Sequence, residues 1–311
     1  MARENKRKRD EKRFGKPERL IDIIAHERIT TVAPEYRHDN FEALMVLMHE
    51  QMRGAVAVDC SNVYEYAIDT FNGKVFSFRD DVPNCMPQFP SMFLEYVETG
   101  GTRVGWFIHA FEDSTCGKNH AFTVVGHMFL AMIGSDGSMD AHLLGCIGIA
   151  INENGIAIGN AGVMPSFNKK MSNKDYEDAK SLLLTSSVFP FLAISFMHCK
   201  NVSITAVQPE KAIEKQRLKA GLKPFLRYHT ININPMKQIL KTEGDAEQSG
   251  LKKALHICRG HFSSYTEDKP LFGRKGMHGQ FWTPAHVRGS IAKGIVNSDY
   301  KVGIPTPGGP T

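Results

Sequence analysis

The sequence predicts an α+β protein, in which a mixed helix and antiparallel-sheet N-terminal domain is followed by a small, basic, β-rich C-terminal domain. Two stretches, 40–53 and 173–200, space their apolar residues as helices do. The stretch 103–133 is instead rich in β-branched and aromatic residues, which favour strands. Beyond residue 250, short segments alternate in the way of strands and gather basic, histidine and aromatic residues. A chain of 311 residues is long enough to bury the cores of two such domains.

The beginning of the chain predicts a basic tail followed by two helices. Residues 1–16 are nearly free of apolar side chains and are expected to be disordered. Pro17 then precedes a helix over Glu18–Glu27, whose apolar residues share one face. A second helix is expected over Asn40–Arg53, with its first residue as the N-cap and Gly54 as its end.

Between residues 60 and 100 the sequence predicts a hairpin and a short helix. The dipeptide Asn72-Gly73 favours a tight turn between strands at Tyr64–Phe71 and Lys74–Phe78. The range Pro90–Val97 is expected to be helical, because Pro-Ser begins it and two glycines follow it.

The middle of the chain predicts antiparallel strands. Two of them are expected at Arg103–Phe111 and His120–Ile133, on either side of a polar loop. A further hairpin is expected between Leu143–Ile151 and Gly155–Ile158.

One long, mostly buried helix is expected next, over Asn173–Lys200. Ser172 or the first helical residue would cap it, and Pro190 would kink it. A short strand, Asn201–Val207, is expected to pack after this helix.

These elements divide the chain into four expected parts. They are a disordered basic tail (1–16), an α+β target-recognition domain (17–207), a linker (208–224) and a basic, β-rich domain that contacts RNA (225–311).

Composition narrows the class of protein further. Six cysteines without any CxxC pair indicate reduced, mostly buried thiols rather than a disulfide framework. No apolar run reaches the roughly 18 residues of a membrane-spanning helix, since the longest candidate, Ser181–Met197, is broken by two serines and Pro190. No signal peptide is expected either, so we expect a cytoplasmic protein without a membrane partner.

Charge is concentrated at the two ends of the chain. Residues 1–19 contain nine Lys and Arg against four Asp and Glu, and residues 250–301 contain nine against three. Two basic ends around a net acidic middle suggest a polyanionic partner, and solvated surface charge is the alternative for the N-terminal run.

Several site classes are not indicated. The sequence has no P-loop, no glycine-rich dinucleotide motif, no GxSxG elbow and no HExxH, so no cofactor is expected. His109, His120, His127 and His142 lie in or beside the expected strands, but they lack the regular spacing of a metal site. We therefore expect hydrogen-bonded sheet histidines and no bound metal.

The C-terminal segment holds the candidate nucleic-acid site. Arginine binds phosphate with two donors, aromatic rings stack on unpaired bases, and a glycine lets another backbone approach closely. The expected contact residues are His256, Arg259, Gly260, Phe262, Tyr265, Arg274, Trp282 and Arg288.

The same segment leaves three other interpretations open. His261 and His286 could perform metal-free RNA cleavage if they face one another, with Arg259 or Arg288 holding the phosphate. The spacing His256-x-Cys258-x-x-His261 is a weak pattern for zinc. A plain β-barrel with an aromatic core and solvated charges would need no ligand at all.

A family resemblance adds to these residue-level observations. The pattern H-x-x-R-G-H-aromatic, then W-x-P-A and a closing Val, resembles the C-terminal end of a phage-borne type V-A anti-CRISPR family. The ranges Pro190–Ala193 and Asn201–Thr205 are similar in layout to that family's buried helix and following strand. The residues that carry the C-terminal pattern are His256, Arg259, Gly260, His261, Phe262, Trp282, Pro284, Ala285 and Val287, and Phe262 stands where family members carry Trp.

The resemblance implies how such a protein would act. That family lowers production of an RNA-guided effector nuclease by recognising its nascent polypeptide and causing loss of its mRNA. The leading hypothesis is therefore a phage or mobile-element protein, in the cytoplasm of a bacterial host cell, that binds RNA or translating ribosomes through residues 250–301. Its N-terminal domain would select the target nascent polypeptide. A toxin-like, metal-free endoribonuclease and a non-enzymatic protein-interaction module are the alternatives, and no oligomeric state is predicted.

Overall fold

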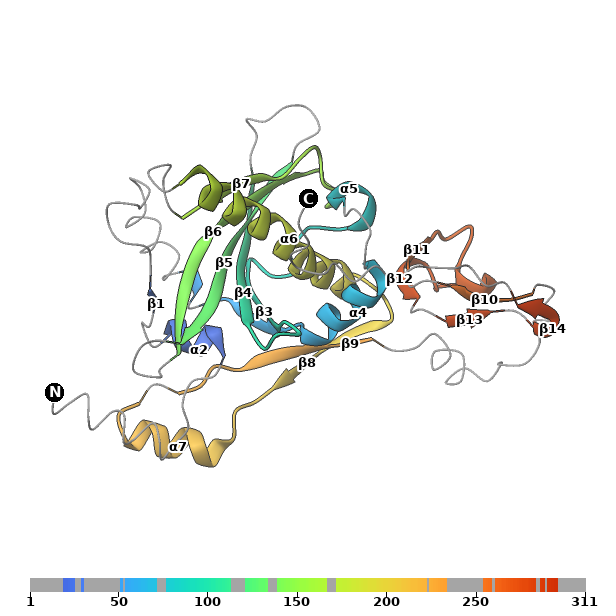
Figure 1. The fold of residues 1–311 in the computed structure, drawn as a ribbon. Coiled ribbons are helices and arrows are strands. Elements are labelled where there is room, and N and C mark those ends of the chain that lie inside the picture. The colour runs from blue at the N-terminus through green and yellow to red at the C-terminus, as the bar shows by residue number, and fades with distance from the viewer. Residues whose placement is uncertain are drawn as a thin grey trace.

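The structure is a computed structural model, and its described residues form a large mixed sheet with helices on both faces (Figure 1), which confirms the α+β prediction. It describes residues 19–25, 29–30, 51–52, 54–71, 77–112, 121–133, 139–166, 172–222, 224–233, 254–258, 261–283, 286–288 and 290–295. The expected tail, most of the expected helix at 40–53 and the Asn72-Gly73 turn lie outside these residues. Within them, the large sheet has nine strands in the order β1-β6-β5-β4-β3-β2-β9-β8, with β7 added beside β6.

The middle of this sheet is an antiparallel ladder of four strands that follow one another in the chain. They are β3 (Ser91–Val97), β4 (Arg103–Glu112), β5 (Phe122–Ile133) and β6 (Met139–Ile151). The predicted strands at 103–111 and 120–133 are therefore confirmed. The chain turns after β6 and bridges back from Ala157 to Ile151, as the predicted hairpin requires, before β7 (Gly162–Pro165) pairs with β6.

The strands at either end of the ladder come from distant parts of the chain. On one side, β2 (Val56–Asp59) runs parallel to both β3 and β9 (Tyr228–Ile233), and β8 (Val202–Val207) closes that edge. On the other side, β1 (Ile29–Thr30) runs parallel to β6. The predicted strand at 201–207 is confirmed. The large sheet continues beyond residue 224, where the β-rich part was expected to begin, because β9 pairs with β2 and β8.

Two predicted elements have the opposite secondary structure. The range predicted as a strand at 64–71 is part of helix α4 (Ser61–Phe71), and the short helix α5 (Phe78–Asp81) follows it. In α4, Val63, Tyr64 and Ala67 are buried together, because one face of the helix packs on the core. The range predicted as a helix at 90–97 is strand β3, which is buried on both faces between β2 and β4, so sheet pairing overrides the local Pro-Ser signal.

The long helix α6 (Asn173–Met197) confirms the prediction, including its cap: the Ser172 hydroxyl accepts a hydrogen bond from the Asp175 amide at 3.1 Å. Its C-terminal half, from Pro190 onward, is buried against the sheet. By length and composition alone α6 could cross a membrane, but 61% of its most apolar window is buried inside the protein. We interpret it as the core helix of the fold.

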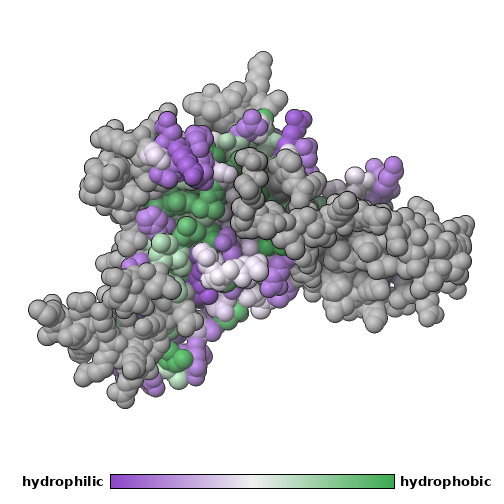
Figure 2. Space-filling view, viewed as in Figure 1, coloured by the Kyte–Doolittle hydropathy of each residue, from purple (hydrophilic) through white to green (hydrophobic). Residues whose placement is uncertain are grey.

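Apolar side chains fill both faces of the sheet. On the α6 side, the core includes Trp106, Met128 and Phe191. On the other side, the short helix α2 (Leu20–Ala25), predicted at 18–27, packs its leucine and isoleucines over Phe93 and Phe129. Figure 2 also shows hydrophobic residues at the surface over β5 and β6, and β5 contributes Met132, which is 51% exposed.

The C-terminal part contributes two small sheets. One is the two-stranded sheet of β11 (His261–Tyr265) and β12 (Gly279–Thr283), with a 3-10 turn at Leu271–Gly273 between them. The other has β10 (Ala254–Cys258) between β13 (His286–Arg288) and β14 (Ser290–Ile295). The predicted linker contains helix α7 (Lys211–Lys219).

The β11–β12 sheet is part of the main core. The Trp282 side chain is 1% exposed, and its ring centroid lies 4.7 Å from that of Phe196 in α6 and 4.7 Å from that of Phe262. These rings complete a core built by the N-terminal part of the chain.

We expect Trp282→Ala to destabilise the whole protein by about 3–5 kcal/mol, because it removes a large ring from the shared core and leaves a cavity. Urea unfolding followed by far-ultraviolet circular dichroism measures this. A separate C-terminal domain would instead give two transitions, of which only the smaller one responds to the substitution.

Candidate functional site

The C-terminal strands keep one register through both small sheets. Cys258 pairs with His286 in the β10–β13 ladder, and His261, three residues later, pairs with Thr283, three residues before His286. We call these four strands (β10, β11, β12 and β13) together the arm; residues 259–260 and 284–285, between its two ladders, lie outside the described residues. The candidate contacts Arg259 and Gly260 lie outside the described residues, and His256 and Arg288 are cross-strand partners in the arm.

The two candidate catalytic histidines lie in different ladders. His261 pairs with Thr283 in the β11–β12 ladder, and His286 pairs with Cys258 in the β10–β13 ladder. Metal-free cleavage needs both imidazoles at one phosphate. The catalytic pair stays a prediction, because the residues that join the two ladders, 259–260 and 284–285, lie outside the described residues.

The predicted base-stacking role of two aromatic residues is also corrected. Phe262 and Trp282 pair directly across the β11–β12 ladder and pack on Phe196, so the Trp282 ring has no free face for a base. Tyr265 is half-buried and meets the Phe281 ring edge-on at 5.7 Å. Their aromatic character signalled core packing, and sequence alone does not separate that use from nucleic-acid stacking.

A buried asparagine attaches the arm to the main sheet, and the sequence analysis did not single out its side chain. Asn201, 1% exposed at the start of β8, donates from its amide nitrogen to the Trp282 carbonyl at 2.7 Å. Its side-chain oxygen accepts from the Trp282 amide at 2.9 Å. The Lys200 amide also donates to the Gln280 carbonyl at 2.8 Å. The Asn201 side chain thus makes the two hydrogen bonds that the backbone of a neighbouring strand would make. Both backbone groups of Trp282 therefore have partners within the core.

With the aromatic rings directed inward, the arm presents its cations in the connection between β11 and β12. Lys269 and Lys275 are exposed, and the candidate Arg274 is half-buried with partners of its own. His278 lies 3.7 Å from the Glu267 carboxylate. His261, Lys269 and Lys275 are exposed, so a phosphate could reach them.

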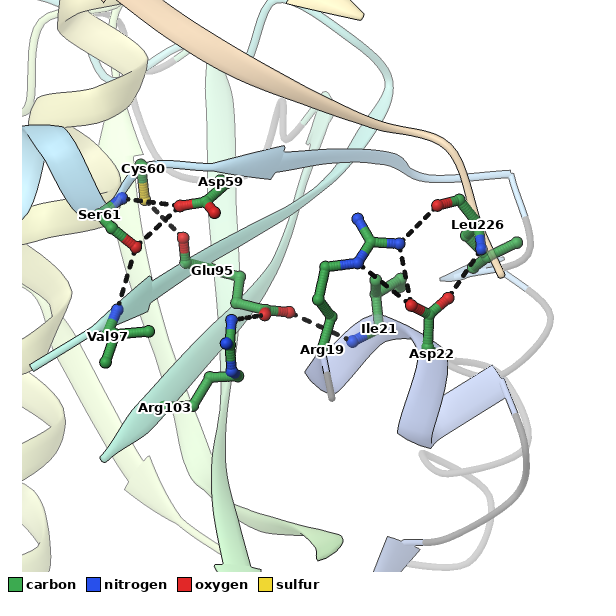
Figure 3. A network of polar contacts seen from close by, with 10 residues as sticks. All are labelled: Arg19, Ile21, Asp22, Asp59, Cys60, Ser61, Glu95, Val97, Arg103 and Leu226. Atoms are coloured by element: carbon green, nitrogen blue, oxygen red, sulfur yellow. Dashed lines mark hydrogen bonds and ion pairs between the residues drawn. The ribbon is translucent and has the colours of Figure 1, made fainter. Parts of the chain in front are cut away.

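A second cluster of polar groups fixes the beginning of the described chain to the sheet (Figure 3). The Arg19 guanidinium donates to the Asp22 carboxylate at 3.1 and 2.9 Å and to the Leu226 carbonyl. Asp22 in turn accepts from the Leu226 amide at 2.7 Å. Arg19 also lies over the Tyr228 ring, 4.1 Å from its centroid. This clamp joins α2 to the segment that leads into β9.

Glu95 of β3 continues the network inside the protein (Figure 3). Its carboxylate pairs with Arg103 and accepts from the Ile21 amide at 3.4 Å. Burial raises the pKa of Glu95 from its ordinary value of 4.5 to about 7, and the charge of Arg103 opposes this rise.

The pocket beside this network is small. It has a volume of about 180 Å³, open mouth included, and its polar lining comes from Arg19, Asp59, Glu95 and Tyr228. Asp59 itself is engaged by the amide and hydroxyl of Ser61, at 3.0 and 2.8 Å. Pockets for metabolites usually have about 300–1,000 Å³, so we interpret these residues as a structural clamp rather than a substrate site.

The middle-region histidines lie in or beside the sheet strands, but the expected hydrogen bonds are missing at two of them. His109 Nε2 and His127 Nδ1 are buried without a hydrogen-bond partner among the described residues. His109 and His127 stack with ring centroids 5.6 Å apart, and burial lowers the pKa of His127 to about 3, so it stays neutral. No group of three or more His, Cys, Asp or Glu suited to a metal occurs among the described residues. Four cysteines are free thiols, and three of these, Cys60, Cys85 and Cys199, are fully buried.

Comparison with known proteins adds no relative. No family model, curated protein or solved structure matches the chain. Its function has to be inferred from its own residues and from the resemblance in its C-terminal pattern.

We expect the buried Glu95 to weaken the fold as pH rises. Between pH 4.5 and about 7 the folded state holds a proton on Glu95 that the unfolded state has lost, so the free energy of unfolding decreases with pH across that window. Relative to the wild type, Glu95→Gln should gain on the order of 3 kcal/mol between pH 4.5 and pH 7.5, read from urea unfolding. A difference that does not change with pH would contradict the raised pKa.

We expect Asn201→Ala to cost about 2–3 kcal/mol, because it leaves the buried amide and carbonyl of Trp282 without partners. Asn232→Ala is the matched control: Asn232 is exposed and bonds only to the Thr205 hydroxyl, at 2.9 Å, so its loss should cost less than about 0.5 kcal/mol. Equal costs for the two variants would refute a special role for Asn201.

Proposed function

We propose that this chain is a phage or mobile-element protein that binds RNA, free or on the translating ribosome, and lowers the expression of a target protein. The C-terminal arm would contact the RNA, and the large sheet with its helices would select the nascent polypeptide. This is the mode of action of the type V-A anti-CRISPR family that its C-terminal pattern resembles.

The observation that carries the proposal is the contact between the two segments in which the resemblance lies. One segment contains Asn201 and the other contains Phe262 and Trp282, and about 60–80 residues separate them in the chain. Asn201 bonds to both backbone groups of Trp282, and the two aromatic rings pack on the end of α6. Both segments of the resemblance therefore belong to one packed unit. This supports the proposal that the chain and the anti-CRISPR family share a fold in this region.

The proposed RNA contact differs from the one expected from sequence. Phe262 and Trp282 would hold the arm in place, and the cations between β11 and β12 would meet the phosphates. Lys269 and Lys275 are suited to this role because both are exposed and neither forms an ion pair within the described part of the chain. Lysine binds phosphate as a point charge, so this contact would not depend on RNA sequence.

The two alternative functions have less support. A ribonuclease would need His261 and His286 at one phosphate, and the two lie in different ladders with different cross-strand partners. A pure protein-interaction module would leave the exposed lysines of the arm without a role, and it becomes the better description if the protein does not bind RNA.

We expect the purified chain to bind labelled single-stranded RNA in EDTA, in a salt-dependent manner and without cleaving it. Lys269→Ala/Lys275→Ala should lower the slope of log affinity against log salt by about 1.4, because each lost phosphate contact contributes about 0.7. Gel shifts at several salt concentrations measure the slope, and a denaturing gel detects cleavage.

Lys174→Ala/Lys180→Ala, on α6, removes the same charge from another surface and should leave the slope unchanged. Cleavage that disappears in His261→Ala would replace the proposal by the ribonuclease alternative. If the wild type does not bind RNA, the RNA assignment fails. The effect on expression is tested by adding the protein to cell-free translation of a type V-A effector nuclease and measuring its mRNA against an unrelated mRNA.

A further inference from the structure

Strand β8 lies at the rim of the large sheet, and β9 is its one neighbour in the described part of that sheet (Figure 1). In an antiparallel ladder, the amide and carbonyl of every second residue point away from the neighbouring strand. The Val202 amide donates to the Cys199 carbonyl at 3.1 Å and so is not directed at β9. The alternation then directs the backbone groups of Ile204 and Ala206 away from β9 as well. β8 therefore presents a row of backbone donors and acceptors, about 7 Å from one pair to the next, along its outer edge.

This edge lacks the features that usually protect an edge strand, which are prolines, charges or a very short length. The opposite end of the sheet has them, since β1 has two residues and β7 has four and ends in Pro165. β8 has six residues, Val-Ser-Ile-Thr-Ala-Val, without a charge or a proline. Ser203, Thr205 and Ala206 are exposed. An open edge of this composition is suited to pairing with a further strand.

The protein itself seats a strand at the beginning of the same edge. The Lys200 amide donates to the Gln280 carbonyl, and the Asn201 side chain bonds to both backbone groups of Trp282. β12 of the arm therefore lies beside the two residues that lead into β8. Within the described part of the chain, Val202–Val207 have no such contact with the arm. A strand added there would continue a row that β12 begins.

The chemistry of the edge favours an extended polypeptide as the occupant. The edge offers donors and acceptors together, whereas a phosphate offers acceptors alone, so the RNA backbone does not match it. The backbone of another extended chain matches both kinds of group. A second copy of this protein would meet β8 through a pair of six-residue edges, a smaller contact than the roughly 1,200 Å² that stable protein pairs bury.

The two faces of β8 define the side chains that such an occupant needs. Residues that pair across a ladder point to the same face of the sheet. Val202 and Ile204 lie on the α6 side, where both pack against the main core. Ser203 and Thr205 lie on the other side and are exposed. A bound strand would therefore place apolar residues next to the core at every second position, with polar residues between them.

We propose that β8 binds an extended segment of the target polypeptide, which pairs with its open edge as an additional strand and alternates apolar and polar side chains. Backbone hydrogen bonds would supply the affinity, and the alternation would supply the selectivity. This inference rests on the proposed function, in which the large sheet selects a nascent polypeptide, and it adds the place and the chemistry of that selection.

The test measures binding of the full chain to fluorescein-labelled, overlapping 15-residue peptides that span a type V-A effector nuclease, read by fluorescence polarisation. We expect binding to peptides with alternating apolar and polar residues. Ala206→Pro removes an outward amide and adds a ring at the open edge, so it should weaken binding at least about tenfold. Ala206→Thr keeps the amide and suits a strand, so it should change binding less than about twofold. Circular dichroism checks that both variants fold.

A second measurement changes the peptide and leaves the protein intact. Because an added strand bonds to β8 through every second residue, N-methylation of one alternate set of peptide amides should abolish binding. N-methylation of the other set should weaken it far less. Equal effects of the two sets, equal effects of Ala206→Pro and Ala206→Thr, or a wild type that binds none of the peptides would each overturn pairing at β8.

The outcomes separate this inference from the proposed function. RNA binding without peptide binding would refute the open edge as a polypeptide site and leave the arm as the RNA site. Peptide binding that Ala206→Pro removes, in a protein that does not bind RNA, would keep the β8 site and refute the RNA contact. Light scattering that shows a wild-type dimer and an Ala206→Pro monomer would assign the edge to a second copy and overturn the target segment as its occupant.

Discussion

The contact between the end of α6 and the C-terminal arm is the constraint on which the organisation of this protein depends. The buried half of α6 covers one face of the large sheet, and Phe196 near its end would be exposed without Phe262 and Trp282. Aromatic rings of this size gain roughly 1.5–3 kcal/mol each on burial, so the arm and the sheet stabilise one another. Asn201 fixes the position of the arm in this contact, because its side-chain amide hydrogen-bonds to both the amide and the carbonyl of Trp282.

The sequence predicts the parts of the fold that depend on local patterns. α6, its Ser172 cap and the strands at β4, β5 and β8 follow from periodicity and capping chemistry. The local pattern of β3 predicts a helix, because its Pro-Ser start and following glycines resemble helix boundaries, while its pairing with β2 and β4 is non-local. The place of β9 in the large sheet escapes prediction for the same reason: its partner Ala57 lies far away in the chain.

The candidate site could be predicted only in part. Residue types located a basic, aromatic C-terminal segment, but they do not distinguish a ring that stacks on a base from a ring that fills a core. Burial assigns Trp282 to the core and leaves lysines as the groups available to phosphate. The roles of Asn201, Arg19 and Asp22 carry no sequence motif, because each depends on a backbone group far away in the chain.

The order of the chain gives the aromatic contact a consequence during synthesis. Phe196 leaves the ribosome many residues before Trp282. Its ring at the end of α6 therefore stays exposed until Trp282 has been synthesised, while the rest of the sheet can already assemble. Every product that stops short of residue 282 keeps an open aromatic surface. Such a surface attracts chaperones and proteases and favours aggregation. Closure of this core therefore requires synthesis past residue 282, because a shorter chain lacks the ring that covers Phe196.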